Sequence, residues 1–195
     1  MPKLVDHDAR REEIVDAVMR VVARDGYAGL SVRTVAQEAG WSPGSIRHYF
    51  RTQQELIGFA MTTLSARVRV RIERQGSRAT DLDGVARLLE EILPLDSARR
   101  VESEVWLALA VAAHTDPELG AIWREVNTGL HGLMESCVLV VAELSGRALD
   151  IPAETDRLHA LTDGLALHGT LRPRLSAARM RAALRTHLAE LAAGR

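Results

Sequence analysis

Cysteine, lysine and long apolar runs are nearly absent from this sequence. The one cysteine, Cys137, excludes a disulfide framework within the chain and a cysteine-based zinc cluster, which fits a reducing cytoplasm. The longest apolar candidate, residues 137–142, is far shorter than the roughly 18 residues needed to cross a membrane. The N-terminal residues are polar and lack the apolar core of a secretion signal. We therefore expect a cytoplasmic protein that has no membrane partner.

Strand signals are missing as well. No stretch alternates cleanly between apolar and polar residues, and only two tyrosines and two phenylalanines are available to favour strands. Apolar residues instead recur at spacings of three and four along nearly the whole chain, which is typical of amphipathic helices. The pattern predicts an all-α fold of about nine helices, near residues 8–25, 32–39, 43–50, 54–75, 82–93, 97–115, 117–144, 152–171 and 177–192.

The chain has 26 acidic residues and 25 lysines and arginines, so its charge balance indicates no strongly basic surface overall. A nucleic-acid partner would therefore have to bind a local patch. One candidate patch is residues 39–54, a stretch without any aspartate or glutamate. Another group of positive charge lies at helical spacing further along the chain and consists of Arg67, Arg71, Arg74 and Arg78. We expect this basic stripe to be a solvated helix face.

Two short predicted helices meet at a tight corner around this acid-free stretch. Ser42 and Pro43 are an N-cap and a first-turn proline for the second of the two helices. A steep crossing needs small residues at the contact; Ala36 supplies the small residue, Gly40 the turn and Ile46 the apolar plug. This spacing is typical of a DNA-binding helix-turn-helix, whose second helix enters a major groove about 12 Å wide.

The polar side chains around the corner suit a DNA backbone, because phosphate oxygens attract positive charge and accept hydrogen bonds. A carboxylate facing phosphate would be repelled, which gives the missing acids a reason. A helix-turn-helix can also be mere scaffold, but the spacing, the preceding helix, the cap and the acid-free surface together favour DNA binding. Positive charge comes from Arg33, Arg47, His48 and Arg51, and hydroxyl donors come from Ser42, Ser45, Tyr49 and Thr52.

Residues 9–56 resemble the N-terminal domain of the tetracycline-repressor (TetR) family of transcriptional regulators. The matching segments are DGYAGLSV, VAQEAGWSPGSIRHYF and a closing F-x3-QEL. The resemblance implies a three-helix DNA-binding domain in residues 1–53, a helical ligand-binding and dimerisation domain in residues 54–195, and a homodimer. The expected DNA-contacting residues are Ser31, Arg33, Thr34, Ser42, Ser45, Arg47, His48, Tyr49, Arg51 and Thr52.

Two positions depart from the family pattern. Arg47 stands where the family usually has tyrosine, and its guanidinium would either anchor a phosphate, which we favour, or read a guanine. Gln53 stands where many relatives carry lysine, which implies a weaker phosphate contact at the start of the fourth helix.

The C-terminal two-thirds resembles the betaine-regulator-type body found in part of that family. The likeness lies in EVWLALAVAAHTDPELGAIWREV and LTDGLALHGTLRPRLSAARMRAALRTHL. Polar residues on apolar helix faces are candidate effector ligands, and tryptophan faces would attract a cation such as a quaternary amine. The alternative is that these residues are ordinary core. The candidate effector-binding residues are Glu102, Trp106, Trp123, Asn127, Met134 and Asp163.

The last two predicted helices carry apolar and small residues that would suit a four-helix dimer interface. The alternative is that these residues face the chain's own core, and both can hold at once because the helix is apolar on more than one side. A homodimer is the natural partner of a palindromic operator in double-stranded DNA, with reading helices about 34 Å apart. The two stripes are Ala160, Gly164, Leu167 and Leu171, followed by Leu184, Leu188 and Leu191.

The sequence therefore predicts a regulator of transcription, in the form of a repressor that a small molecule of unknown identity releases from DNA. A ligand-independent or architectural DNA-binding protein is the first alternative. An enzyme is the second, with Glu102, Asp163 and His168 as candidate acid–base groups. No nucleophile elbow, phosphate-binding glycine loop or metal-ligand motif is present, so we expect no catalysis, no cofactor and no metal site.

Overall fold

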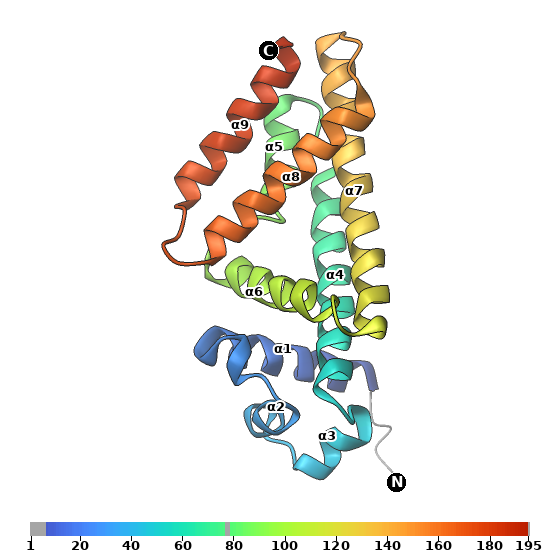
Figure 1. Ribbon diagram of the computed structural model, residues 1–195. Coiled ribbons are helices and arrows are strands. Elements are labelled where there is room, and N and C mark those ends of the chain that lie inside the picture. Colours follow the sequence, from blue (N-terminus) through green and yellow to red (C-terminus); the bar gives the residue numbers. More distant parts are fainter. Residues whose placement is uncertain (1–6, 77–78, 195) are drawn as a thin grey trace. The chain divides into compact units, whose positions relative to one another are not determined.

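The computed structural model describes residues 7–76 and 79–194 (Figure 1). Within these ranges every regular element is a helix, which confirms the all-α prediction. The elements are α1 (His7–Asp25), the 3₁₀ helix η1 (Tyr27–Gly29), α2 (Val32–Ala39), α3 (Pro43–Tyr49), α4 (Gln53–Gly76), α5 (Leu82–Glu90), α6 (Ser97–Ala112), α7 (Pro117–Ser145), α8 (Ile151–Thr170) and α9 (Ala177–Ala193).

Helix starts agree with the sequence better than helix ends do. Helix α5 ends at Glu90 rather than near residue 93, because the following residues form tight turns instead of continuing the α-helical hydrogen bonds. The N–H of Leu93, for example, donates to the carbonyl of Glu90 at 3.3 Å. Helix α6 likewise ends at Ala112, and the N–H of Thr115 donates to that residue's carbonyl at 3.2 Å. Such tightened last turns satisfy carbonyls that a helix end would leave unpaired.

The described residues group into two compact units. The first contains the residues up to 66 together with 104–123, and the second contains 67–103 together with the residues from 124 onward. Helices α4, α6 and α7 contribute residues to both units. The expected functional boundary after residue 53 stays a prediction.

In the first unit, the apolar stripe of α1 forms the centre of the core. Ile14, Val18 and Val21 are fully buried, as expected for an amphipathic helix that packs one face against its neighbours. The first turns of α4 and α7 also approach each other closely. A Cβ atom on Gly58 would lie 2.7 Å from Cδ1 of Ile122, so this glycine allows the two helices to pack.

The second unit has a core built mainly from leucine. Residues of α5, α7, α8 and α9 contribute to it, among them Leu89, Met134, Leu158 and Leu184, each fully buried. The single cysteine, Cys137, lies in the same core with 4% of its surface exposed. Removal of the thiolate from water raises the pKa of the Cys137 thiol to about 12, so the thiol stays protonated and unreactive.

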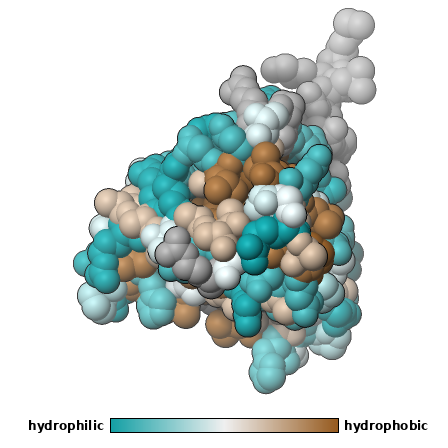
Figure 2. Space-filling view, turned by 90° about the horizontal axis from the view of Figure 1, so that it is seen from above, coloured by the Kyte–Doolittle hydropathy of each residue, from teal (hydrophilic) through white to brown (hydrophobic). Residues whose placement is uncertain are grey.

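Apolar side chains reach the surface at scattered points. In the view from above, apolar residues lie near the middle and also at the edge, among hydrophilic residues (Figure 2). None of the helices, within the part of the chain that the structure describes, is long and apolar enough to span a membrane. The large exposed apolar side chains are Val70, Val111, Leu139, Leu144, Leu167 and Leu171.

Candidate nucleic-acid interface and effector site

The corner between α2 and α3 has the geometry that the sequence predicts. Gly40 ends α2 in the left-handed conformation, with φ at +69°, where any side chain would strain the backbone. Its N–H donates to Gln37 O at 3.2 Å, and the N–H of Trp41 donates to Ala36 O at 2.9 Å. This is the hydrogen-bond pattern of a helix that stops at a glycine. Ala36 and Ile46 are both fully buried at the corner.

Helix α3 begins with a side-chain cap and buries one face. The hydroxyl of Ser42 accepts the N–H of Ser45 at 3.1 Å, which satisfies a free donor at the helix start. Ile46 and the following Phe50 are buried, whereas Arg47 and His48 are exposed. The polar face of α3 is therefore open to solvent in the first unit.

The other expected DNA-contacting residues divide into two groups. Ser31 and Thr34 cap α2: the hydroxyl of Thr34 donates to the Gly29 carbonyl at 2.8 Å and accepts the N–H of Ser31 at 2.9 Å. These hydroxyls already serve the local fold. Tyr49 is half-buried. The remaining side chains are exposed, namely those of Arg33, Ser42, Ser45, Arg51 and Thr52.

The two glutamates that flank the acid-free stretch are both engaged. Glu38 accepts from Arg24 at 2.6 Å and from Arg20 at 2.8 Å, and these hydrogen bonds hold the pKa of the Glu38 carboxyl below its usual range. Glu55 turns back and accepts the backbone N–H of Arg51 at 2.8 Å. The charge of Glu38 is thus balanced by two arginines, and the carboxylate of Glu55 is held by a backbone hydrogen bond.

A chain of ring contacts joins α1 to α3, and the sequence analysis did not single it out. The guanidinium carbon of Arg10 lies 5.3 Å from the centroid of the Trp41 ring. Trp41 in turn meets Tyr49 edge to face at 5.8 Å, and Tyr49 meets His48 at 5.7 Å. A tryptophan beside a helix cap, in a chain with so few aromatic residues, is the sequence signal that could have indicated this cluster.

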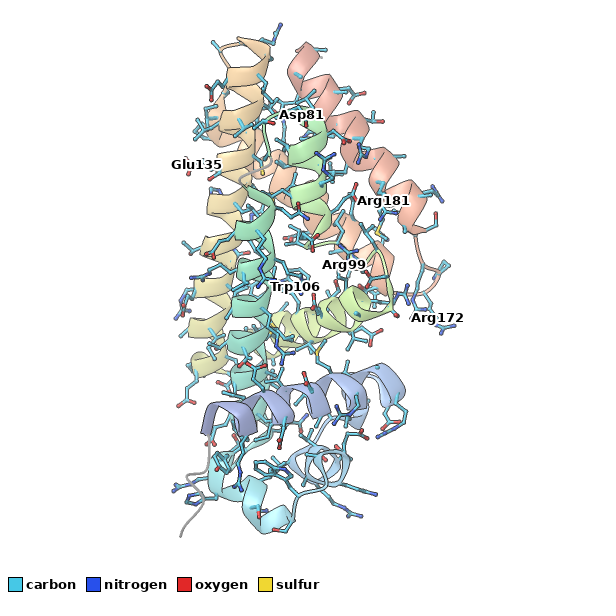
Figure 3. All side chains as sticks on the ribbon, turned by 180° about the vertical axis from the view of Figure 1, so that it is seen from behind. Asp81, Arg99, Trp106, Glu135, Arg172 and Arg181 are labelled. Carbon is cyan, nitrogen blue, oxygen red and sulfur yellow. The ribbon has the colours of Figure 1, made fainter. Side chains whose placement is uncertain are left out.

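The expected effector residues do not all fall in one unit. Trp106 and Trp123 belong to the first unit, where their ring centroids lie 5.4 Å apart. Both rings are half-buried, and the indole N–H of Trp106, a labelled residue of α6 in Figure 3, has no hydrogen-bond partner among the described residues. Two adjacent aromatic rings with an available donor form a suitable wall for a small ligand.

The other expected effector residues lie in the second unit in different surroundings. Met134 is fully buried in the core, and Asn127 is half-buried. Burial raises the pKa of the Asp163 carboxyl, while the neighbouring His159, with Nε2 at 3.8 Å, opposes this when it is protonated. Glu102 is occupied: its two oxygens accept from Arg71 at 2.9 and 2.6 Å. An effector that used Glu102 would have to compete with Arg71.

Arg71 therefore does not belong to a solvated stripe, contrary to the expectation from the sequence. Its side chain is only 30% exposed, and its Nε also lies 3.3 Å from the Glu91 carboxylate. Arg78, the last member of that stripe, lies outside the described residues. A second set of ion pairs ties α9 to the end of α5, where Arg181 contacts Glu90 at 3.0 Å (Figure 3). Arginines that look like surface charge in the sequence hold helices of the second unit together.

The apolar stripes of α8 and α9 differ in their surroundings. The α9 leucines, Leu184, Leu188 and Leu191, are buried in the chain's own core, so for α9 the alternative interpretation is the correct one. On α8, Leu167 and Leu171 remain 36% and 53% exposed. Between α8 and α9 lies an open groove of about 590 Å³, lined by Arg157, Ala160, Leu161, Ala182, Ala183, Thr186, His187 and Glu190.

Comparison with protein families gives two matches. Residues 14–58 match the model described as bacterial regulatory proteins, tetR family. Residues 82–193 match the model described as BetI-type transcriptional repressor, C-terminal. The second match alone covers more than half of the chain.

Individual proteins agree with these matches. The HTH-type transcriptional regulator PksA of Bacillus subtilis is 39% identical over 177 residues, which cover 89% of this chain and 84% of that protein. A transcriptional regulator from Rhodococcus has a similar crystal structure, with a TM-score of 0.80 and 31% sequence identity. The match covers 94% of this chain and 96% of that protein. A putative transcriptional regulator from Saccharomonospora viridis, solved in complex with choline, has a TM-score of 0.79 at 23% sequence identity. That match covers 93% of this chain and 96% of the other protein.

Proposed function

Because the chain belongs to the TetR family of bacterial transcriptional regulators and has a BetI-type C-terminal region, we propose that it represses transcription from a palindromic operator as a homodimer. A small effector releases it from this DNA. The observation that carries the proposal is the surface of α3, where Arg47 and His48 are exposed within an acid-free stretch and the flanking glutamates are engaged elsewhere.

Helix α3 is the reading helix of this proposal. A left-handed glycine corner and a buried plug at Ile46 fix its inner face, so its outer face is free to enter a major groove. Arg33, Arg51 and the hydroxyls of Ser42 and Ser45 supply contacts to the phosphates that flank the groove. Arg47 anchors a phosphate in this proposal rather than reading a guanine.

Dimerisation uses the exposed side of α8 together with the groove beside α9. Leu167 and Leu171 are exposed there, and a Cβ atom on Gly164 would meet nothing within 4 Å among the described residues. A second copy of the chain would cover these apolar side chains by the same surface on each subunit, as a two-fold interface requires. Two subunits then present two α3 helices to the two halves of a palindrome.

The effector is a small cation, and Trp106 and Trp123 recognise it. The face of a tryptophan ring attracts a positive charge, by about 0.5–2 kcal/mol depending on desolvation. The choline held by the Saccharomonospora viridis protein supports this choice of ligand class. Helix α4 contributes residues to both units, and we assign it the transmission of effector binding to the DNA-binding residues. Release requires that the effector bind the DNA-free state more tightly than the DNA-bound state.

DNA binding is tested with purified protein and the promoter region of its own gene. Footprinting should protect a palindrome, and Arg47→Ala should weaken binding roughly tenfold or more because each subunit loses a charge-assisted hydrogen bond to phosphate. Arg179→Ala changes an exposed arginine of α9 and is the matched control. A chain that protects no sequence and binds every duplex equally would instead be an architectural protein.

The effector class is tested by titration of choline and of its uncharged isostere 3,3-dimethylbutanol into the protein–operator complex. Choline should release the DNA and quench tryptophan emission, and the isostere should do neither at the same concentration. Trp123→Leu should abolish the response to choline and leave operator binding intact. Equal responses to both compounds would show that the charge is not recognised.

A further inference from the structure

We propose that Arg10, which lies outside the helix-turn-helix, is a further phosphate-binding residue of the DNA-binding surface, and that Trp41 is the positioning residue that holds its guanidinium. This inference rests on the proposed DNA-binding function. It adds a phosphate ligand from α1, and it gives a role to a tryptophan that the motif leaves unexplained.

The geometry joins Arg10 to the reading helix through two ring contacts. The Arg10 guanidinium lies over the Trp41 ring at 5.3 Å from its centroid, within the distance of about 6 Å at which a cation is attracted to a ring face. Trp41 meets the ring of Tyr49 at 5.8 Å with an interplanar angle of 61°. Arg10 is exposed, and Trp41 and Tyr49 are half-buried, so the cation sits on the solvent side of a partly fixed aromatic pair.

A guanidinium held over a ring face is well prepared to bind phosphate. The ring attracts the cation from one side, and a guanidinium has five N–H donors, so donors remain for a phosphate on the other side. The ring carries no net charge, so it does not neutralise the arginine. It also restricts a flexible side chain before DNA arrives, which reduces the entropy lost on binding.

Two other arginines of α1 show the contrast. Arg20 and Arg24 both donate to the Glu38 carboxylate, at 2.8 and 2.6 Å, so their charge is neutralised within the protein. Arg10 instead neighbours Trp41, which directly precedes the cap of α3 and belongs to the acid-free stretch. The aromatic contact therefore places a positive charge from α1 at the edge of the proposed DNA surface.

The experiment measures operator affinity against salt concentration for the full-length chain and its variants. Removal of one phosphate ligand per subunit should reduce the slope of log K against log salt by about 0.9 for each subunit. Arg10→Ala should show this reduction and weaken binding roughly tenfold. Arg179→Ala, at an exposed arginine of α9, is the control and should retain the wild-type slope.

Trp41 is tested by its coupling to Arg10. Trp41→Ala should reproduce the smaller salt slope although Arg10 is still present, and the double variant should be little worse than either single variant. Trp41→Phe keeps a ring face and should retain most of the slope. Urea unfolding of each variant checks that the fold is intact, and Trp41→Leu, which also lacks a ring face, replaces Trp41→Ala in the comparison if the latter does not fold.

The outcomes separate the two proposals. If Arg10→Ala binds with the wild-type affinity and slope, Arg10 binds no phosphate and the inference is wrong. If both single variants bind more weakly but their effects add in the double variant, the positioning role of Trp41 is wrong. If wild-type protein and the Arg179→Ala control bind no duplex at all, the proposed function itself fails, and the inference fails with it.

Discussion

Arg71 and Glu102 form a bidentate ion pair between α4 and α6 within the second unit. The two guanidinium nitrogens lie 2.9 and 2.6 Å from the two carboxylate oxygens, and this pairing raises the pKa of Arg71. Arg71 also lies 3.3 Å from Glu91, which follows the end of α5. A single arginine thus joins three helical segments, through charge-assisted hydrogen bonds to Glu102, which are stronger than neutral ones, and through an ion pair with Glu91.

Removal of one partner of this pair should destabilise the protein. In Glu102→Ala the guanidinium of Arg71 loses its main acceptor in a site where the two side chains are only 30% and 19% exposed. We expect a loss of about 1–2 kcal/mol in the free energy of unfolding, measured by urea denaturation. Glu135→Ala removes an exposed glutamate of α7 and should change stability by less than about 0.5 kcal/mol. Equal effects of the two substitutions would contradict a structural role for the pair.

The two glycines Gly40 and Gly129 should respond to alanine in opposite directions. Neither would place its new Cβ within 4 Å of a neighbour among the described residues, but Gly40 has a φ of +69°. Gly40→Ala should therefore cost about 1 kcal/mol through backbone strain alone. Gly129 lies inside α7 with a negative φ, and Gly129→Ala should stabilise by about 0.5–1 kcal/mol. Thermal unfolding measures both, and a stabilising Gly40→Ala would exclude a strained corner.

The proposed dimer should fail when a charge is placed on α8. Leu167→Glu would bury a carboxylate in the interface, and we expect it to weaken the dimer by more than roughly tenfold. The control, Leu139→Glu, changes a leucine of α7 that is 51% exposed and should remain dimeric. Analytical ultracentrifugation measures the subunit equilibrium of each protein. If Leu167→Glu stays as dimeric as the control, the interface lies elsewhere.

The half-buried carboxyl of Asp163 should make stability depend on pH. Its pKa in the folded chain is raised by burial, so the folded state holds this proton more tightly than the unfolded state. The contribution of Asp163 to the free energy of unfolding therefore falls as pH rises from the ordinary aspartate pKa of about 3.9 through the raised value. Asp163→Asn cannot ionise.

Asp163→Asn should accordingly be the more stable protein at about pH 8 and should equal the wild type below about pH 3.5. The gain should stay below about 1 kcal/mol, because the side chain is 42% exposed and solvent screens its charge. Glu135→Gln, at an exposed glutamate of α7, serves as the control in urea unfolding across the pH range. A gain that persisted at low pH would have a cause other than ionisation.

Features that depend on neighbouring residues could be predicted from the sequence. The Ser42 cap and the Gly40 corner follow from local backbone preferences, and both are present as expected. The apolar spacing of three and four indicated the helices and their starts. Helix ends were less predictable, because the tight turns after Glu90 depend on packing rather than on a local stop signal.

Pairings between distant residues could not be predicted. Arg71 and Glu102 are 31 positions apart, and each has an ordinary place in an amphipathic helix, so nothing local couples them. The same holds for Arg10 and Trp41. The α9 leucines illustrate a further limit: periodicity shows that Leu184 and Leu188 share one face of a helix, but it does not show which partner covers that face.

The burial of Cys137 makes the chain convenient for site-specific chemistry. Its thiol is 4% exposed and burial raises its pKa to about 12, so maleimide dyes and mild oxidants will leave it unmodified in the folded protein. A cysteine introduced at an exposed position would then be the one that reacts. Spin labels or fluorophores can be attached near α3 without first removing the native sulfur, and the distance between the two α3 helices of the proposed dimer can be followed as choline is added.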